Sequence, residues 1–94
     1  MKSILQNVKR CYICGSTVGL EEHHIYFGSR RSASTRNGFT CWLCGYHHRD
    51  TKNGVHGNRT LDLQLKKACQ RQYEKTHSRA DFMKIIGRNY LNIL

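Results

Sequence analysis

The clearest pattern of apolar and polar positions lies in the second half of the chain and predicts a helix of about four turns that begins near Thr60. Asn58 or Thr60 is expected to cap this helix, and Asp62 places a negative charge in its first turn, where the helix dipole favours it. Cys69 lies on the apolar face and is expected to be a buried thiol. The positions on that face are Leu61, Leu65, Ala68, Cys69, Gln72 and Tyr73.

A capping pattern further along the chain predicts a second helix. Ser78 is followed three residues later by Asp81, and this S-x-x-D spacing indicates a helix that runs through Ile86. Gly87 is expected to end it, because glycine readily adopts the left-handed conformation of a helix C-terminus. The tail that follows, RNYLNIL, contains enough apolar residues to fold back on the core.

Two short segments in the first half have the composition of β-strands. The first, residues 22–27, is rich in β-branched and aromatic residues and ends at Gly28. The second, residues 39–43, follows an Asn37-Gly38 pair that is typical of a turn. The segment between them, GSRRSASTRNG, is polar and predicts a loop. Together these features predict a hairpin with a long basic loop.

The length and composition indicate one small domain, residues 1–94, that needs help to stay folded. Only 38% of its 94 residues are hydrophobic, and a globule of this size buries only about 60–65% of its unfolded surface. Five Cys and six His make bound metal the first candidate for that help. A metal-binding hairpin part is expected over about residues 11–76, and a C-terminal helical extension over about residues 77–94.

The cysteine count and the first residues bear on the cellular compartment. Five Cys cannot all pair, and MKSILQNVKR lacks the run of about 7–15 apolar residues of a secretory signal. Disulfides are therefore the weaker interpretation. No apolar stretch approaches the roughly 18–20 residues of a membrane span. We therefore expect a cytoplasmic protein that has no membrane segment.

A formal net charge of +10 arises from 16 Lys and Arg against six Asp and Glu. Such a balance is typical of proteins that bind polyanions, because cations docked on phosphates release counterions; a merely solvated basic surface is the plain alternative. The window from His23 to Arg49 contains no acidic residue, but it holds four of the six His and two of the five Cys. We expect the arginines of this window to bind DNA phosphates: Arg30, Arg31, Arg36 and Arg49.

Two sets of residues compete for a structural Zn²⁺ site. Cys11-x-x-Cys14 and Cys41-x-x-Cys44 form a four-thiolate pattern, whereas Cys44-x-x-His47 has the same spacing and leaves Cys41 out. Alternate side chains of a strand face opposite sides, so Cys41 and Cys44 would converge only if the strand broke between them. TCWL has strong strand character. The set Cys11, Cys14, Cys44 and His47 is therefore favoured, with Cys41 as a buried thiol.

Two pairs of adjacent histidines bracket the predicted hairpin. His23-His24 lies at the start of the first strand, and His47-His48 follows the second. Successive strand residues face opposite sides, so one member of each pair can reach a catalytic metal while its neighbour does something else. His24 is a candidate general base, because an imidazole with a pKa of about 6.5 suits proton abstraction near neutrality.

These motifs resemble the HNH, or ββα-metal, endonucleases. The resemblance runs over roughly residues 11–75, through CYIC, LEEHHI, NGFTCWLCGYHH and the helix that follows. In HHIYFGS, WLCGYHH, NGVH and the C-terminal GRNYL, the chain is similar to the recombination-enhancement HNH nucleases of phages and their prophage relatives. The fold that this implies is a small α+β structure. A ββα-metal (His-Me finger) hairpin and helix would be braced by zinc knuckles, with an additional C-terminal helix.

By this resemblance, His24 matches the general base, and His23 matches the preceding residue that binds the catalytic divalent metal. His48 matches the metal ligand on the helix side and directly follows the last zinc ligand, which supports the structural site of three Cys and one His. His56 departs from the simplest pattern and is a candidate for a third metal ligand or a phosphate contact. Asn37 is the nearest candidate for the family's central Asn, a catalytic position, although it lies about two residues earlier than the common spacing.

The implied activity is metal-dependent hydrolysis of DNA phosphodiester bonds. It would require the structural Zn²⁺ and a catalytic divalent metal, for which imidazole ligands accept Mg²⁺, Mn²⁺, Ni²⁺ or Zn²⁺. The resemblance further suggests a phage- or prophage-encoded protein that works with a recombination or phage replication protein. One alternative is a non-catalytic zinc module that binds nucleic acid. Another is a zinc store or partner-docking surface, in which the histidines do no phosphate chemistry.

Overall fold

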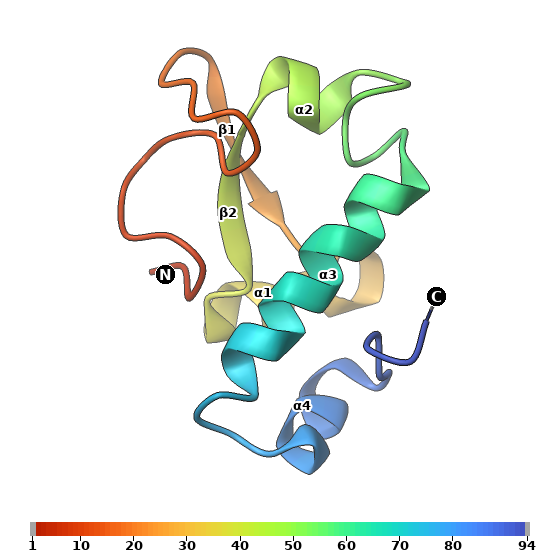
Figure 1. Ribbon diagram of the computed structural model, residues 1–94. Helices are drawn as coiled ribbons and strands as arrows, with labels where there is room; N and C mark the ends of the chain where they lie inside the picture. The colour runs from red at the N-terminus through yellow and green to blue at the C-terminus, as the bar shows by residue number, and fades with distance from the viewer. Residues whose placement is uncertain (1, 94) are drawn as a thin grey trace.

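A two-stranded antiparallel sheet and four α-helices make up the part of the chain that the structure describes, residues 2–93 of a computed structural model (Figure 1). Met1 and Leu94, the outer ends of the first segment and of the tail, lie outside the described residues. The radius of gyration of 12.7 Å is that of one compact globule of this length, about 13 Å for 100 residues. The elements are β1 (Leu20–His24), a short 3-10 helix η1 (Gly28–Arg30), α1 (Arg31–Asn37), β2 (Thr40–Cys44), α2 (Gly45–Arg49), α3 (Arg59–Tyr73) and α4 (Arg79–Ile86).

The two strands pair as the predicted hairpin and give it an inner and an outer face. Glu22 pairs with Trp42, and His23 pairs with Cys41, across the antiparallel ladder. Because side chains alternate along a strand, His23, Cys41 and Leu43 turn inward and are buried, whereas Glu22 and Trp42 lie on the outer face. β1 begins two residues and ends three residues earlier than predicted, and β2 is shifted by one residue.

The connection between the strands is helical, so the prediction of a long loop is wrong. Ser34 is fully buried in α1; its hydroxyl donates to the Tyr26 carbonyl (2.6 Å) and accepts from the Tyr26 amide (3.1 Å). Gly38, expected in a hairpin turn, instead ends α1 with a left-handed φ of 71°. A side chain at Gly38 would also collide with the Lys2 carbonyl. The polar composition concealed this helix because only Ala33 and Ser34 of its seven residues are buried.

The two helices predicted in the second half are present with the predicted caps. The side chain of Asn58 accepts a hydrogen bond from the Leu61 amide (3.1 Å), so Asn58 rather than Thr60 caps α3. Ser78 caps α4 in the same way, through a hydrogen bond of 3.0 Å to its hydroxyl. Gly87 ends α4 in the left-handed conformation, as expected.

Aromatic rings from distant segments join the helices to the inner face of the hairpin. Phe82 of α4 is fully buried, with its ring centre 5.5 Å from that of Tyr26 and 5.9 Å from that of Phe39. Tyr90 packs on Tyr26 at 5.4 Å, so the tail folds back on the core, and Cys69 is buried in α3, both as predicted. In Figure 1, α3 lies across the hairpin, with α2 beyond its first turn and α4 beyond its last.

Candidate metal sites and active site

Three cysteines and one histidine lie together where the N-terminal segment meets the end of β2 and the start of α2. The metal-binding atoms of Cys11, Cys14, Cys44 and His47, here called the CCCH group, lie within 4.8 Å of one another. His47 Nδ1 is 3.3 Å from Cys44 Sγ and 3.9 Å from Cys11 Sγ, and the Sγ atoms of Cys14 and Cys44 are 3.8 Å apart. Such a donor set could hold a metal ion such as zinc in a closed tetrahedral site. The structure thus brings together the four residues that the sequence favours.

Local backbone geometry explains why these residues converge. Gly15 has a left-handed φ of 79°, and its amide donates to the Cys11 carbonyl (2.8 Å), which turns the first two cysteines toward one point. The Tyr12 amide is hydrogen-bonded to β2 (2.8 Å) and fixes this turn against the sheet. Cys44 ends β2, and His47 lies three residues further on in α2, so their side chains face the same side.

Cys41 lies outside the CCCH group. It faces the core from β2, and burial raises the pKa of its thiol to about 12, so the thiol stays protonated. In Cys11, burial also works to raise the pKa, but hydrogen bonds from the backbone of Cys44 and from its own turn outweigh burial and lower the pKa to about 6. Because the thiolate is the form that binds metal, Cys11 suits a ligand and Cys41 suits the core.

Three histidines from three segments form a second group. His23 of β1, His48 of α2 and His56 of the loop before α3, here called the three-histidine group, have their metal-binding nitrogens within 4.8 Å of one another. The Nε2 atoms of His48 and His56 are 3.1 Å apart. The Val55 amide donates to the His47 carbonyl (2.8 Å) and folds the loop back on α2. The structure therefore brings His56, a candidate for a third metal ligand or a phosphate contact, together with the expected pair of His23 and His48, in a position that fits a third ligand.

The His23 imidazole fits a metal ligand because one of its nitrogens lacks any other partner. The residue is 1% exposed, and its Nε2 is the one buried side-chain nitrogen or oxygen within residues 2–93 that has no hydrogen bond. An unpaired buried polar atom costs about 1–3 kcal/mol, which coordination to a metal would remove. Burial, and then the neighbouring His56 and His48, lower the pKa of His23 to about 3. The ring is therefore neutral and keeps a lone pair for a metal.

Glu21 orients His48, and sequence reasoning missed this contact. Glu21 Oε1 accepts hydrogen bonds from His48 Nδ1 (2.7 Å) and Arg49 Nε (2.8 Å). With the proton assigned to Nδ1 by this bond, His48 Nε2 is left as an acceptor that faces the other histidines. The hydrogen bond from His48 lowers the pKa of Glu21. A signal was present, because Glu21 lies two residues before His23 and so on the same face of β1.

The three-histidine group opens onto a hollow of about 290 Å³. His24 lines this hollow, and burial, followed by the charge of Arg31, lowers the pKa of its imidazole. The ring is thus neutral near pH 7 and able to accept a proton. Arg31 and Arg49 bring positive charge to the same space, and Glu22 and Phe27 complete its lining. The hollow gathers the expected base, the expected metal ligands and two of the expected arginines.

Three of the residues predicted for catalysis or DNA binding do not line the hollow. Asn37 is in the last turn of α1, where its Nδ2 donates to the Ala33 carbonyl of the same helix (2.8 Å). Arg36 donates to a serine hydroxyl of α1 (2.6 Å), and the guanidinium of Arg30 lies against Gly87. These residues were expected near the hollow because a loop was predicted; the helical turns of η1 and α1 direct them elsewhere.

Comparison with known proteins gives no match. No family model, no curated protein and no solved structure matches the chain, so the resemblance to HNH nucleases stays a prediction. The fold and the site define a small α+β protein with two separate groups of Cys and His, each of which could hold a metal ion. Within residues 2–93, no helix is both long and apolar enough to cross a membrane.

Proposed function

We propose that this protein is a metal-dependent endonuclease of the HNH type that hydrolyses phosphodiester bonds in DNA. The observation that carries the proposal is the composition of one hollow, where the three-histidine group, a fourth histidine and two arginines face the same space. Four protein ligands close a metal site, whereas three leave positions for water and phosphate. The CCCH group accounts for a structural metal, so the three-histidine group is available for chemistry.

The histidines and arginines of the hollow each have a role in this proposal, and so does Glu21 behind them. His24 accepts a proton from the attacking water, because its imidazole is neutral and its pKa lies below the ordinary value. Arg31 and Arg49 bind phosphates beside the scissile bond. Glu21 holds the His48 ring with Nε2 toward the other histidines. A divalent cation held by the three-histidine group would stabilise negative charge on the phosphate and on the leaving oxygen.

The donor set narrows the choice of catalytic metal. Three imidazoles without a carboxylate suit Ni²⁺ and Zn²⁺, whereas Mg²⁺ prefers oxygen donors. Affinity at nitrogen-rich sites also rises from Mn²⁺ to Ni²⁺ in the general order of divalent metals. We therefore expect the three-histidine group to bind Ni²⁺ and Zn²⁺ more tightly than Mn²⁺, and Mg²⁺ least tightly.

A plasmid-nicking assay tests the proposed activity. Protein with its structural zinc in place is incubated with supercoiled plasmid and with Mg²⁺, Mn²⁺, Ni²⁺ or Zn²⁺ in turn. We expect cutting with at least one of these metals and a rate about 10²–10⁴-fold lower in His24→Ala, because a positioned general base contributes about that much. His77→Ala is the matched control, since His77 stacks on Tyr73 (4.1 Å between ring centres) and does not line the hollow.

Two results would contradict the proposal. One is the absence of cutting with all four metals, and the other is a His24→Ala variant that cuts as fast as the parent. Binding of DNA without cutting would favour the non-catalytic nucleic-acid-binding module instead. The zinc content of each variant is measured alongside, so that loss of the CCCH group is not mistaken for loss of the base.

A further inference from the structure

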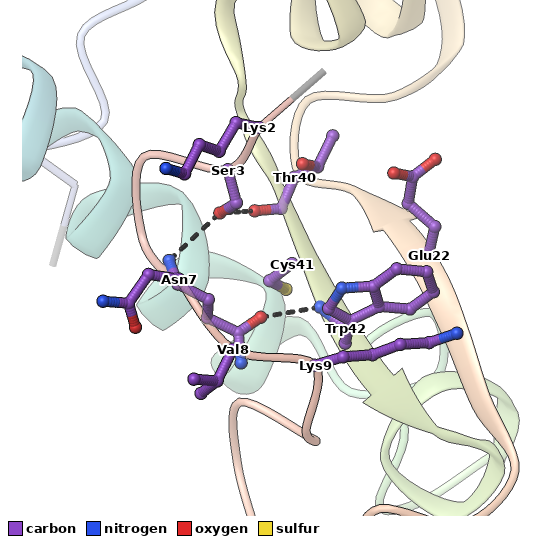
Figure 2. A pocket seen from close by; sticks show the side chains of 10 residues that line it. Lys2, Ser3, Asn7, Val8, Lys9, Glu22, Thr40, Cys41 and Trp42 are labelled. Carbon is purple, nitrogen blue, oxygen red and sulfur yellow. Dashed lines mark hydrogen bonds between the residues drawn. The ribbon is translucent and has the colours of Figure 1, made fainter.

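A second hollow, of about 280 Å³, lies between the outer face of β2 and the N-terminal segment (Figure 2). Trp42 forms its flat wall, and Lys9 Nζ lies 4.5 Å from the centre of the indole ring. Lys2 adds a second positive charge to the lining. Glu22, the partner of Trp42 across the strands, borders both this crevice and the hollow of the three-histidine group. The two spaces therefore share a wall.

The N-terminal wall of the crevice is held to β2 by hydrogen bonds. Gln6 Oε1 accepts from the backbone amide of Trp42 (2.8 Å), and the Tyr12 amide donates to the Trp42 carbonyl (2.8 Å). The Ser3 hydroxyl donates to the Thr40 carbonyl. Both backbone polar groups of Trp42 are thereby paired at this edge of the sheet, so the backbone that carries the indole is held by the N-terminal segment. The crevice is thus part of the fold itself.

We propose that this crevice binds an unpaired nucleotide of single-stranded DNA, with its base stacked on Trp42 and its phosphates held by Lys2 and Lys9. The inference rests on the proposed function and adds the class of substrate, DNA with a single-stranded stretch beside the cutting site. Every base presents a π-face, so a fixed aromatic ring binds bases with little regard to sequence. Lysines at the rim neutralise the phosphates.

Lys9 does not block the indole face. The side chain is exposed, and an ammonium group that stays in contact with solvent is held only weakly by an aromatic ring. A stacked base, in contrast, typically contributes about five- to 150-fold to affinity. The ammonium group can therefore leave the ring and bind a phosphate while the base takes its place.

Glu22 sets the direction in which a strand would lie. Its carboxylate repels phosphate, so the sugar-phosphate backbone is expected to lie away from Glu22, and the edge of the base is expected beside Glu22, where N–H groups of the base can donate to the carboxylate. His24 lies two residues further along the same face of β1, about 7 Å away along the strand. A strand seated on Trp42 therefore leads toward the proposed general base.

The fluorescence of Trp42 tests this inference, because Trp42 is the only tryptophan in the chain. Octathymidylate is titrated into His24→Ala protein that holds its structural zinc, with no other metal added. We expect saturable quenching that weakens as salt rises and exceeds the quenching by a short duplex. With a labelled oligonucleotide, Trp42→Phe should bind within about threefold of its parent, and Trp42→Leu about five- to 150-fold more weakly.

Two matched controls separate the crevice from general effects of charge and aromatic surface. Tyr46→Leu removes an exposed aromatic ring of α2 that does not line the crevice, and it should leave binding unchanged. Lys9→Ala is compared with Lys84→Ala, which removes the same charge from the exposed surface of α4. Of the two variants, only Lys9→Ala should weaken binding. It should also lower the slope of log affinity against log salt concentration by about one, the value for one lost phosphate contact.

Unchanged Trp42 emission, equal quenching by single strand and duplex, or equal affinity of Trp42→Leu and its parent would overturn the inference. Failure of the crevice and failure of the nuclease activity give different combinations of results in the fluorescence titration and the plasmid assay. Quenching by octathymidylate without plasmid cutting would support the crevice and contradict the nuclease. Plasmid cutting without quenching would contradict the crevice and leave the nuclease standing.

Discussion

The CCCH group and the three-histidine group share the short helix α2 but have different surroundings. His47 and His48 are adjacent on this helix, and each belongs to a different group. The CCCH group supplies four donors, three of them thiols, which is typical of a closed structural site. The three-histidine group supplies three nitrogens beside a hollow lined by two arginines, which is typical of a site that leaves room for a substrate. Donor type, ligand number and open space together distinguish the two.

The shared helix makes the three-histidine group depend on the CCCH group. α2 has only five residues, and no side chain caps its N-terminus, so its own propensity cannot hold it in place. A metal in the CCCH group would fix His47, and that would place His48 one residue further on. A metal in the three-histidine group would support the CCCH group less, because one of its ligands, His56, comes from a loop. We therefore expect damage to the CCCH group to abolish both sites, and damage to the three-histidine group to spare the CCCH group.

Loss of a CCCH ligand should have the largest effect. A structural zinc contributes about 10–16 kcal/mol of apparent free energy, as much as the whole stability of a small domain, about 5–15 kcal/mol. His47→Ala should therefore lose zinc and give an unfolded circular-dichroism spectrum. Cys41→Ala is the matched control; it removes a buried sulfur outside the group and should keep its zinc while losing about 1–3 kcal/mol of stability. Zinc loss in Cys41→Ala together with retention in His47→Ala would overturn the assignment.

Glu21→Gln should have a smaller effect, confined to the three-histidine group. The amide is similar in size but removes the charged acceptor of the His48 Nδ1 hydrogen bond, so Ni²⁺ affinity, measured by calorimetric titration, should fall about 10–100-fold. Zinc content and Tm should change little. Glu22→Gln removes the same charge from the outer face of β1 and should bind Ni²⁺ like the parent. Equal losses in the two variants would show that Glu21 acts through net charge alone.

Asn58→Ala should have the smallest effect and should sharpen the contrast between the groups. Asn58 caps α3 and also donates from Nδ2 to the Lys52 carbonyl (2.9 Å), so it ties α3 to the loop that carries His56. We expect a loss of about 1 kcal/mol in the free energy of unfolding and a weakening of Ni²⁺ binding smaller than that in Glu21→Gln. Ser78→Ala removes the corresponding cap of α4 and should cost as much stability without altering Ni²⁺ binding. Identical Ni²⁺ affinities in both variants would contradict a link between the Asn58 cap and the three-histidine group.

The features that the sequence predicted well depend on local geometry. The spacing of Cys44 and His47, combined with strand alternation, predicted that Cys41 would be left out of the CCCH group. The caps at Asn58 and Ser78 are equally local, since each side chain bonds an amide three residues ahead. Such patterns are readable because the backbone alone brings the partners together.

The features that were missed depend on contacts that reach beyond one helical turn or one pair of strand residues. The helix α1 is anchored by Ser34, whose partner Tyr26 lies eight residues earlier. Glu21 meets His48 from 27 residues away, and the Trp42 crevice needs Gln6 from 36 residues away. Charge and periodicity along the sequence do not report which side chains meet across a fold. The roles of His24 and of the arginines stay predictions, because they concern a substrate rather than the fold.

The most direct test of the central claim, that the three-histidine group is a catalytic metal site, is plasmid nicking by protein of known metal content. Parent protein that holds one zinc is titrated with Ni²⁺ or Mn²⁺ while nicking and bound metal are measured together. We predict that nicking begins as a second metal binds. His56 is an exposed member of the three-histidine group, so the His56→Ala variant should keep its zinc but lose both the second metal and the activity. No nicking at saturating metal, or nicking by His56→Ala at the parental rate, would contradict this account.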